Sequence, residues 1–117
     1  MRRGAIHRAD SDACLIPLVW KTTNPWERMR GLLGRPPLVA GQALLIDPCP
    51  SVHTLGMRYP LDLLFLDAEC RAVKLVSSLP PLRWATCSGA RATLELAPVA
   101  LDALNITVGD RLQWRAV

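Results

Sequence analysis

Short apolar blocks, separated by proline, glycine and acidic residues, run along the whole chain and predict a protein built mainly of strands. The block over residues 61–66 is the most distinctive. After Asp62 it places four large apolar residues in a row, which predicts a strand buried on both faces. Residues 71–78 follow a turn and alternate in character, so we expect them to return as its hairpin partner. Further strands are expected over residues 14–20, 43–46, 91–97 and 111–115, with a short extended piece at 52–55.

A strong helix start follows the first of these strands. Asn24 is suited to cap the helix, Pro25 to occupy its first position, and Glu27 to complete a capping box. We expect the helix to run to about Leu33 and to end at Gly34, because glycine adopts the left-handed conformation without strain.

One face of this helix is apolar. At 100° per residue, Trp26, Met29 and Leu33 share that face, and Arg30 lies beside them. We therefore expect the three apolar side chains to pack on the sheet and Arg30 to be partly buried. Its guanidinium would either stay in water while its stem covers apolar surface, or pair with a buried carboxylate.

The remaining segments complete a mainly β fold. Residues 79–89 are expected to form a surface loop near the site, and residues 98–104 a short helix. The pattern predicts a small jelly-roll-like sandwich or barrel with one capped N-terminal helix and one short late helix. The 117 residues fit a single domain, in which residues 1–12 are expected to be a flexible N-terminal arm.

Composition limits the classes of partner. The net charge of +4 comes largely from arginines that are scattered along the chain, so we expect no nucleic-acid interface. No apolar run is long enough to span a bilayer, and polar residues stand where a signal peptide needs its apolar core. We therefore expect a cytoplasmic monomer or weak dimer with no membrane association.

Four cysteines lack the paired spacing of a zinc site. They lie at residues 14, 49, 70 and 87, without a C-x-x-C pair or a nearby histidine. In a reducing compartment such thiols stay free, so we expect no disulfide.

Four blocks follow one another in a specific order: residues 29–35, 57–67, 94–96 and 108–111. Together they resemble the signature of a bacterial and archaeal family, the domain of unknown function 192. The resemblance implies a compact, mostly β fold of jelly-roll or barrel type and no established reaction. Many members of that family look exported or lipid-anchored, which this sequence does not. It also carries Val52 to Gly56 where other members have an aromatic residue before the methionine.

The stretch from Ser51 to Asp67 is the candidate binding site. It places a histidine, a glycine kink, an arginine and an aspartate directly beside the most buried predicted strand. The candidate binding residues are His53, Thr54, Met57, Arg58 and Asp62, joined by Arg30 from the helix. A buried Asp62 needs a partner, and Arg58 and Arg30 are the candidates, either in a structural ion pair or around an open pocket. The predicted function is a small non-catalytic binding or accessory module for a small polar or anionic ligand, or for a protein partner.

The alternative is a small hydrolase or lyase in which His53 acts as general base and Asp62 orients it. A thiol nucleophile next to His53, or a metal held by His53, Asp47 and Asp62, matches no established motif. We therefore assign no catalytic residue, metal or cofactor.

Overall fold

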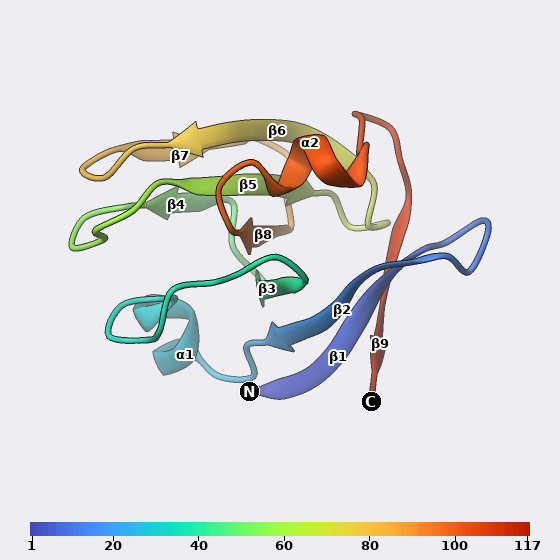
Figure 1. Cartoon of the computed structure of the whole chain (residues 1–117), viewed down its shortest axis with the longest axis horizontal. Helices are drawn as coiled ribbons and strands as arrows, with labels where there is room; N and C mark the ends of the chain where they lie inside the picture. Colours follow the sequence, from blue (N-terminus) through green and yellow to red (C-terminus); the bar gives the residue numbers. More distant parts are fainter.

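The structure, a computed structural model, describes residues 1–117. Strands predominate, with one helix early and one late (Figure 1). The elements are β1 (Arg2–Arg8), β2 (Cys14–Lys21), α1 (Pro25–Arg30), β3 (Gln42–Ile46), β4 (Ser51–His53), β5 (Leu61–Leu66), β6 (Ala72–Leu79), β7 (Trp84–Thr86), β8 (Ala92–Leu96), α2 (Ala100–Leu104) and β9 (Leu112–Ala116).

Seven of the strands form one mixed sheet in the order β6-β5-β8-β3-β2-β1-β9. Only β2 and β3 pair in parallel, and the crossover between them contains α1. The outer strands approach each other at one end through a single bridge between Arg71 and Arg111. The prediction of a mainly β fold with two helices is confirmed, while the sheet is strongly curled but not closed into a barrel.

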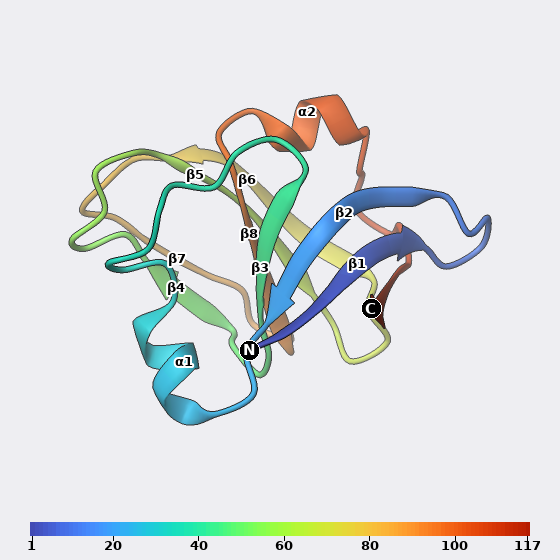
Figure 2. The same ribbon diagram turned by 60° about the horizontal axis from the view of Figure 1, so that its bottom comes forward.

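Both faces of this sheet carry apolar cores, because β5 and β8 at its centre are buried along their whole length. Side chains of a strand alternate between faces. Leu64 and Leu66 pack in one core with Leu101 of α2, whereas Leu63 and Phe65 pack in the other with Leu32, just after α1. The two helices accordingly lie on opposite faces of the sheet (Figure 2).

Helix α1 begins as its sequence predicts. The side chain of Asn24 accepts a hydrogen bond from the amide of Glu27 at 2.9 Å, and the Glu27 carboxylate accepts one from the amide of Thr23 at 2.7 Å. These two bonds form the expected capping box. The helix ends three residues early, at Arg30, because Gly31 adopts a φ of 54° and breaks the repeat.

The early end of α1 overturns its predicted packing. Trp26 and Met29 are 68% and 69% exposed, and no residue of the helix is buried. Arg30 is exposed as well, contrary to prediction, and Arg28 is the arginine that is partly buried. The segment after the helix covers the sheet instead, through Leu32 and Leu38.

Two segments predicted to lack regular structure form strands. Residues 2–8, assigned to a flexible arm, form β1, which pairs with β2 on one side and β9 on the other. Gly4 lies so close to the Trp114 ring that an added Cβ would be 2.6 Å from it. Within the predicted surface loop, residues 84–86 form β7, which pairs with β4 in a separate two-stranded sheet.

Candidate functional site

Asp62 is fully buried, but no arginine binds it. One carboxylate oxygen accepts a hydrogen bond from the amide of Ser78 at 2.7 Å, and the other from the amide of Leu101 at 2.9 Å. Leu101 lies in the first turn of α2, where the helix has no cap of its own, so Asp62 supplies that cap from the sheet. The predicted pairing of Asp62 with Arg58 or Arg30 is wrong, because two backbone amides already satisfy the carboxylate.

Thr54 is also held in a structural role. Its buried hydroxyl donates a hydrogen bond to the carbonyl of Pro80 at 2.6 Å and accepts one from the amide of Arg83 at 2.9 Å. Both partners lie just before β7, so these hydrogen bonds connect the end of β4 to the segment that enters β7. Neither Thr54 nor Asp62 lines the pocket that contains the other candidate residues.

Three of the six candidate residues do meet. His53, Met57 and Arg30 line a pocket of about 60 Å³. Residues 28–33 form one wall, β4 and the segment before it form another, and β3 and β8 close the bottom. Helix α1 lies beside β4 (Figure 2). Arg58 borders a neighbouring hollow with Met57 and makes no hydrogen bond or ion pair of its own.

Glu95 lies at the bottom of this pocket, and sequence reasoning missed it. It belongs to the central strand β8, where its register neighbours are Leu44 on β3 and Leu63 on β5. Only 4% of the residue is exposed, and no protein group forms a hydrogen bond or ion pair with its carboxyl. An oxygen of that carboxyl lies 3.4 Å from the Cβ position of Gly31, so the turn after α1 passes directly over it.

Burial in apolar surroundings changes the acidity of this group. Desolvation raises the pKa of Glu95 from its ordinary value of 4.5 to about 8. At neutral pH the side chain is therefore mostly a carboxylic acid that can both donate and accept a hydrogen bond. The sequence signal was a single acidic residue inside the apolar run Leu94 to Ala97, on a strand that proves to be central.

His53 contributes a second unsatisfied group to the pocket. Its Nδ1 is buried and has no hydrogen-bond partner. The imidazole packs against the indole of Trp84, with the ring centroids 5.1 Å apart. A buried ring nitrogen without a hydrogen bond is uncommon in folded proteins.

The backbone of β4 adds polar groups on the side that does not pair with β7. At the two ends of the two-stranded sheet, the amide of Thr54 donates to the carbonyl of Arg83 and the amide of Cys87 donates to the carbonyl of Pro50. Because pairing groups alternate along an antiparallel strand, the backbone groups of Ser51 and His53 point away from β7. No residue of β7 lines the pocket, so the pocket lies on this free side of β4.

Cys49 lines the same pocket but is not an activated nucleophile. Its thiol donates a hydrogen bond to the carbonyl of Ser51 at 2.9 Å. Burial raises the pKa of the Cys49 thiol, so the reactive thiolate is disfavoured. All four cysteines are free thiols, as predicted.

The residues considered for a metal site are not brought together. Asp47 forms an ion pair with Arg91 at 3.1 Å and lies 3.9 Å from Lys21, while Asp62 faces the opposite core from His53. The structure contains no group of three or more histidine, cysteine or acidic side chains placed to hold a metal ion. For the same reason Asp62 does not orient His53 as a base.

A family comparison decides which proteins this chain belongs with. The family model DUF192, described as "Uncharacterized ACR, COG1430", matches residues 8–114. The chain belongs to the DUF192 family. A curated relative, a UPF0127 protein of Pyrococcus furiosus, is 34% identical over 64 residues, and the match covers 55% of this chain and 55% of that protein. The chain thus matches little more than half the length of this relative.

Solved structures share the fold of this DUF192 protein. A protein of Sinorhizobium meliloti 1021, described as a proposed transcription regulator, superposes with a TM-score of 0.80 at 21% identity, covering 97% of this chain and 92% of that one. A protein of unknown function from Novosphingobium aromaticivorans gives a TM-score of 0.76 at 18% identity, covering 96% and 84%. At these identities the likeness concerns the fold alone. No helix of the structure has the length and apolar character needed to cross a membrane.

Proposed function

We propose that this DUF192 protein is a small binding module that holds a carboxylate or carboxamide group of its ligand in the Glu95 pocket. The observation that carries the proposal is the unpartnered Glu95 carboxyl at the bottom of a pocket that His53 also lines. The site thus keeps His53, Met57 and Arg30 from the sequence prediction and centres them on Glu95.

Unpaired buried polar groups favour a ligand that pairs with them. Leaving such a group without a hydrogen bond costs roughly 1–3 kcal/mol, and that cost is recovered when a ligand supplies the bond. A carboxylic acid and a carboxamide or carboxylate form complementary hydrogen bonds side by side. The pocket is lined by the carboxyl of Glu95, by His53 and by the edge of β4 that does not pair with β7.

Charge favours an acceptor group over a cation. Arg28 and Arg30 border the pocket, and neither guanidinium forms an ion pair with the protein. Their field opposes an ammonium group and attracts an anion. With Glu95 protonated, no negative charge inside the pocket offsets them. The ligand class is therefore anionic or neutral, in keeping with the small polar or anionic ligand expected from the sequence.

Binding is favoured over catalysis because the residues lack an activated nucleophile or an oriented base. The thiol of Cys49 is held protonated, and Asp62 lies on the other side of the sheet from His53. The four free thiols support a reducing, cytoplasmic location.

The test is NMR titration of the amide spectrum with three probes: propionate, propionamide and propylammonium. At about pH 6.5 we expect propionate and propionamide to shift the amide signals of residues around Glu95 and His53, and propylammonium to leave them unchanged. Above the Glu95 pKa of about 8, binding of propionate should weaken by about tenfold for each pH unit, because two carboxylates then repel each other. Binding of propionamide should persist, since its NH₂ group donates to the ionised acid.

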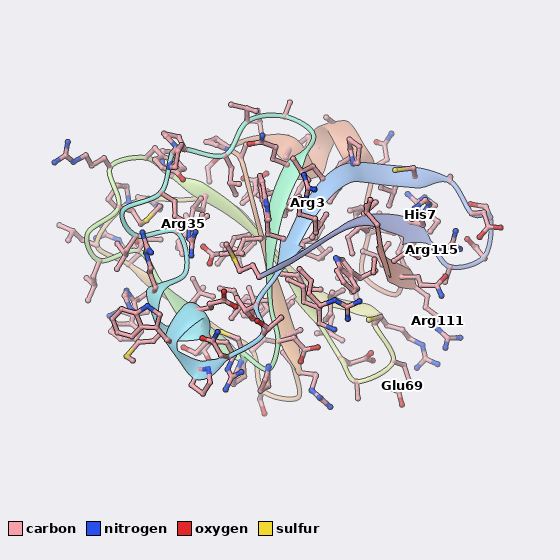
Figure 3. All side chains as sticks on the ribbon, turned by 90° about the horizontal axis from the view of Figure 1, so that it is seen from below. Arg3, His7, Arg35, Glu69, Arg111 and Arg115 are labelled. Atoms are coloured by element: carbon pink, nitrogen blue, oxygen red, sulfur yellow. The ribbon has the colours of Figure 1, made fainter.

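Glu95→Gln is the matched variant, because its amide has the same shape and cannot ionise. It should bind propionate with an affinity that no longer falls above pH 8. Glu69→Gln is the control: Glu69 is exposed and lies well away from α1 (Figure 3). Tight binding of propylammonium, or propionate shifts confined to residues outside the pocket, would overturn the proposal.

A further inference from the structure

We propose that the carboxylate bound in the Glu95 pocket is the C-terminus of a polypeptide whose last side chains are apolar. The inference rests on the proposed function and names its ligand class. It is carried by exposed apolar side chains on the segments that border the pocket, called here the mouth surface and made of Trp26, Met29, Leu55, Leu82 and Trp84, of which Met29 lines the pocket itself.

The pocket is too small for the whole of a typical ligand. Its volume is only about 60 Å³. That space accommodates a carboxylate, and the rest of the ligand has to lie outside it. Pockets that enclose an entire small molecule are several times larger, roughly 300–1,000 Å³.

The mouth surface exposes large side chains that belong to neither apolar core. Trp26 and Met29 stand on α1, which buries no residue, and Trp84 stands beside His53 at the start of β7. The amide of Leu82 donates to the carbonyl of Thr54, which brings Leu82 next to Leu55 at the same end of the β4–β7 sheet. Exposed tryptophan and methionine side chains on neighbouring segments are typical of surfaces that bind apolar side chains.

Charge around the mouth surface matches an anionic partner. Five arginines of the surrounding segments, at positions 28, 30, 35, 58 and 83, take part in none of the ion pairs. The only acidic side chain on α1, Glu27, is already bound to the N-terminal amine at 2.6 Å. A C-terminal carboxylate, ionised at all ordinary pH values, is complementary to this field.

The free edge of β4 distinguishes a peptide from a simple apolar acid. The outward backbone groups of Ser51 and His53 belong to residues that line the pocket and do not pair with β7; of these groups the carbonyl of Ser51 accepts a hydrogen bond from the Cys49 thiol. A peptide backbone can pair with them while its terminal carboxylate reaches Glu95. A fatty acid would leave them unpaired.

The experiment compares two acetylated tetrapeptides ending in two leucines, one with a free carboxylate and one with a C-terminal amide, with propionate as reference. Isothermal titration calorimetry near neutral pH should show the free acid binding at least tenfold tighter than both the amidated peptide and propionate. Trp26→Ala and Leu82→Ala, at exposed residues that do not line the pocket, should weaken peptide binding about tenfold and leave propionate binding unchanged. Val108→Ala, which removes an equally exposed side chain outside the mouth surface, should change neither.

Each outcome separates the two proposals. If propionate binds but the free-acid peptide binds no tighter, the peptide inference fails and the proposed function stands. If neither ligand binds, both fail. Equal affinity for the free acid and the amidated peptide would overturn the inference, as would binding to anionic lipid vesicles that the peptide does not compete for.

Discussion

Glu95→Gln should change how the stability of the protein depends on pH. In the unfolded chain the carboxyl has its ordinary pKa of 4.5, and in the folded protein burial raises the pKa to about 8. Between these values the folded state holds a proton that the unfolded state has released. The free energy of unfolding therefore falls as pH rises through this window, by about 1.4 kcal/mol for each pH unit.

The total effect is large for a domain of this size. Over the window from 4.5 to about 8 the loss amounts to about 5 kcal/mol, against a total stability of roughly 5–15 kcal/mol for ordinary proteins. The group is buried, so solvent screening reduces this figure little. Glutamine fills the same space without titrating, so the unfolding free energy of Glu95→Gln should lack this pH-dependent contribution.

Urea denaturation of the two proteins at about pH 5, 6.5 and 8 measures the effect. The difference in unfolding free energy between wild type and Glu95→Gln isolates this one group, because the other titrations occur in both proteins. We expect Glu95→Gln to gain on the wild type by about 2 kcal/mol between pH 5 and 6.5 and again between pH 6.5 and 8. Curves that run parallel over this range would refute the reasoning, since they would mean that Glu95 is ionised in the folded protein. Glu69→Gln, exposed, should give such parallel curves.

Three further substitutions test the fold. Asp62→Asn should destabilise by roughly 2–4 kcal/mol, because an amide cannot accept both backbone hydrogen bonds; thermal denaturation with unchanged stability would contradict the capping of α2 from the sheet. Gly4→Ala should lower the melting temperature through its clash with Trp114, and hydrogen exchange should show faster exchange in β1; a neutral result would restore the flexible arm. Asn24→Ala should cost about 1 kcal/mol in chemical denaturation through loss of the helix cap, and an unchanged midpoint would argue against the assigned start of α1.

Features set by neighbours in the sequence were predictable. The cap of Asn24 depends on residues within one helical turn, and the burial of residues 61–66 follows from an unbroken apolar run. The end of α1 was not predictable in the same way. Gly31 and Gly34 both suit a helix end, and Gly31 ends it because this residue turns over the Glu95 carboxyl.

The site was only partly predictable because its parts meet through pairing across the sheet. His53, Met57 and Arg30 were identified from one stretch and one helix. Glu95 enters from β8, more than forty residues from His53, and nothing local shows which strand stands at the centre. Asp62 was included in the predicted site because the sequence does not show on which face of the sheet the pocket lies. Strand alternation turns Asp62 toward α2, on the other face.

The pairing of β1 with β9 has a consequence for synthesis of the chain. Gly4 lies opposite Ala116, so one edge of the first strand stays without its neighbour until residue 116 has left the ribosome. Contacts this distant in sequence slow folding, and an open strand edge invites pairing with other chains. A ribosome stalled before residue 112 would release a molecule whose β1 edge is bare.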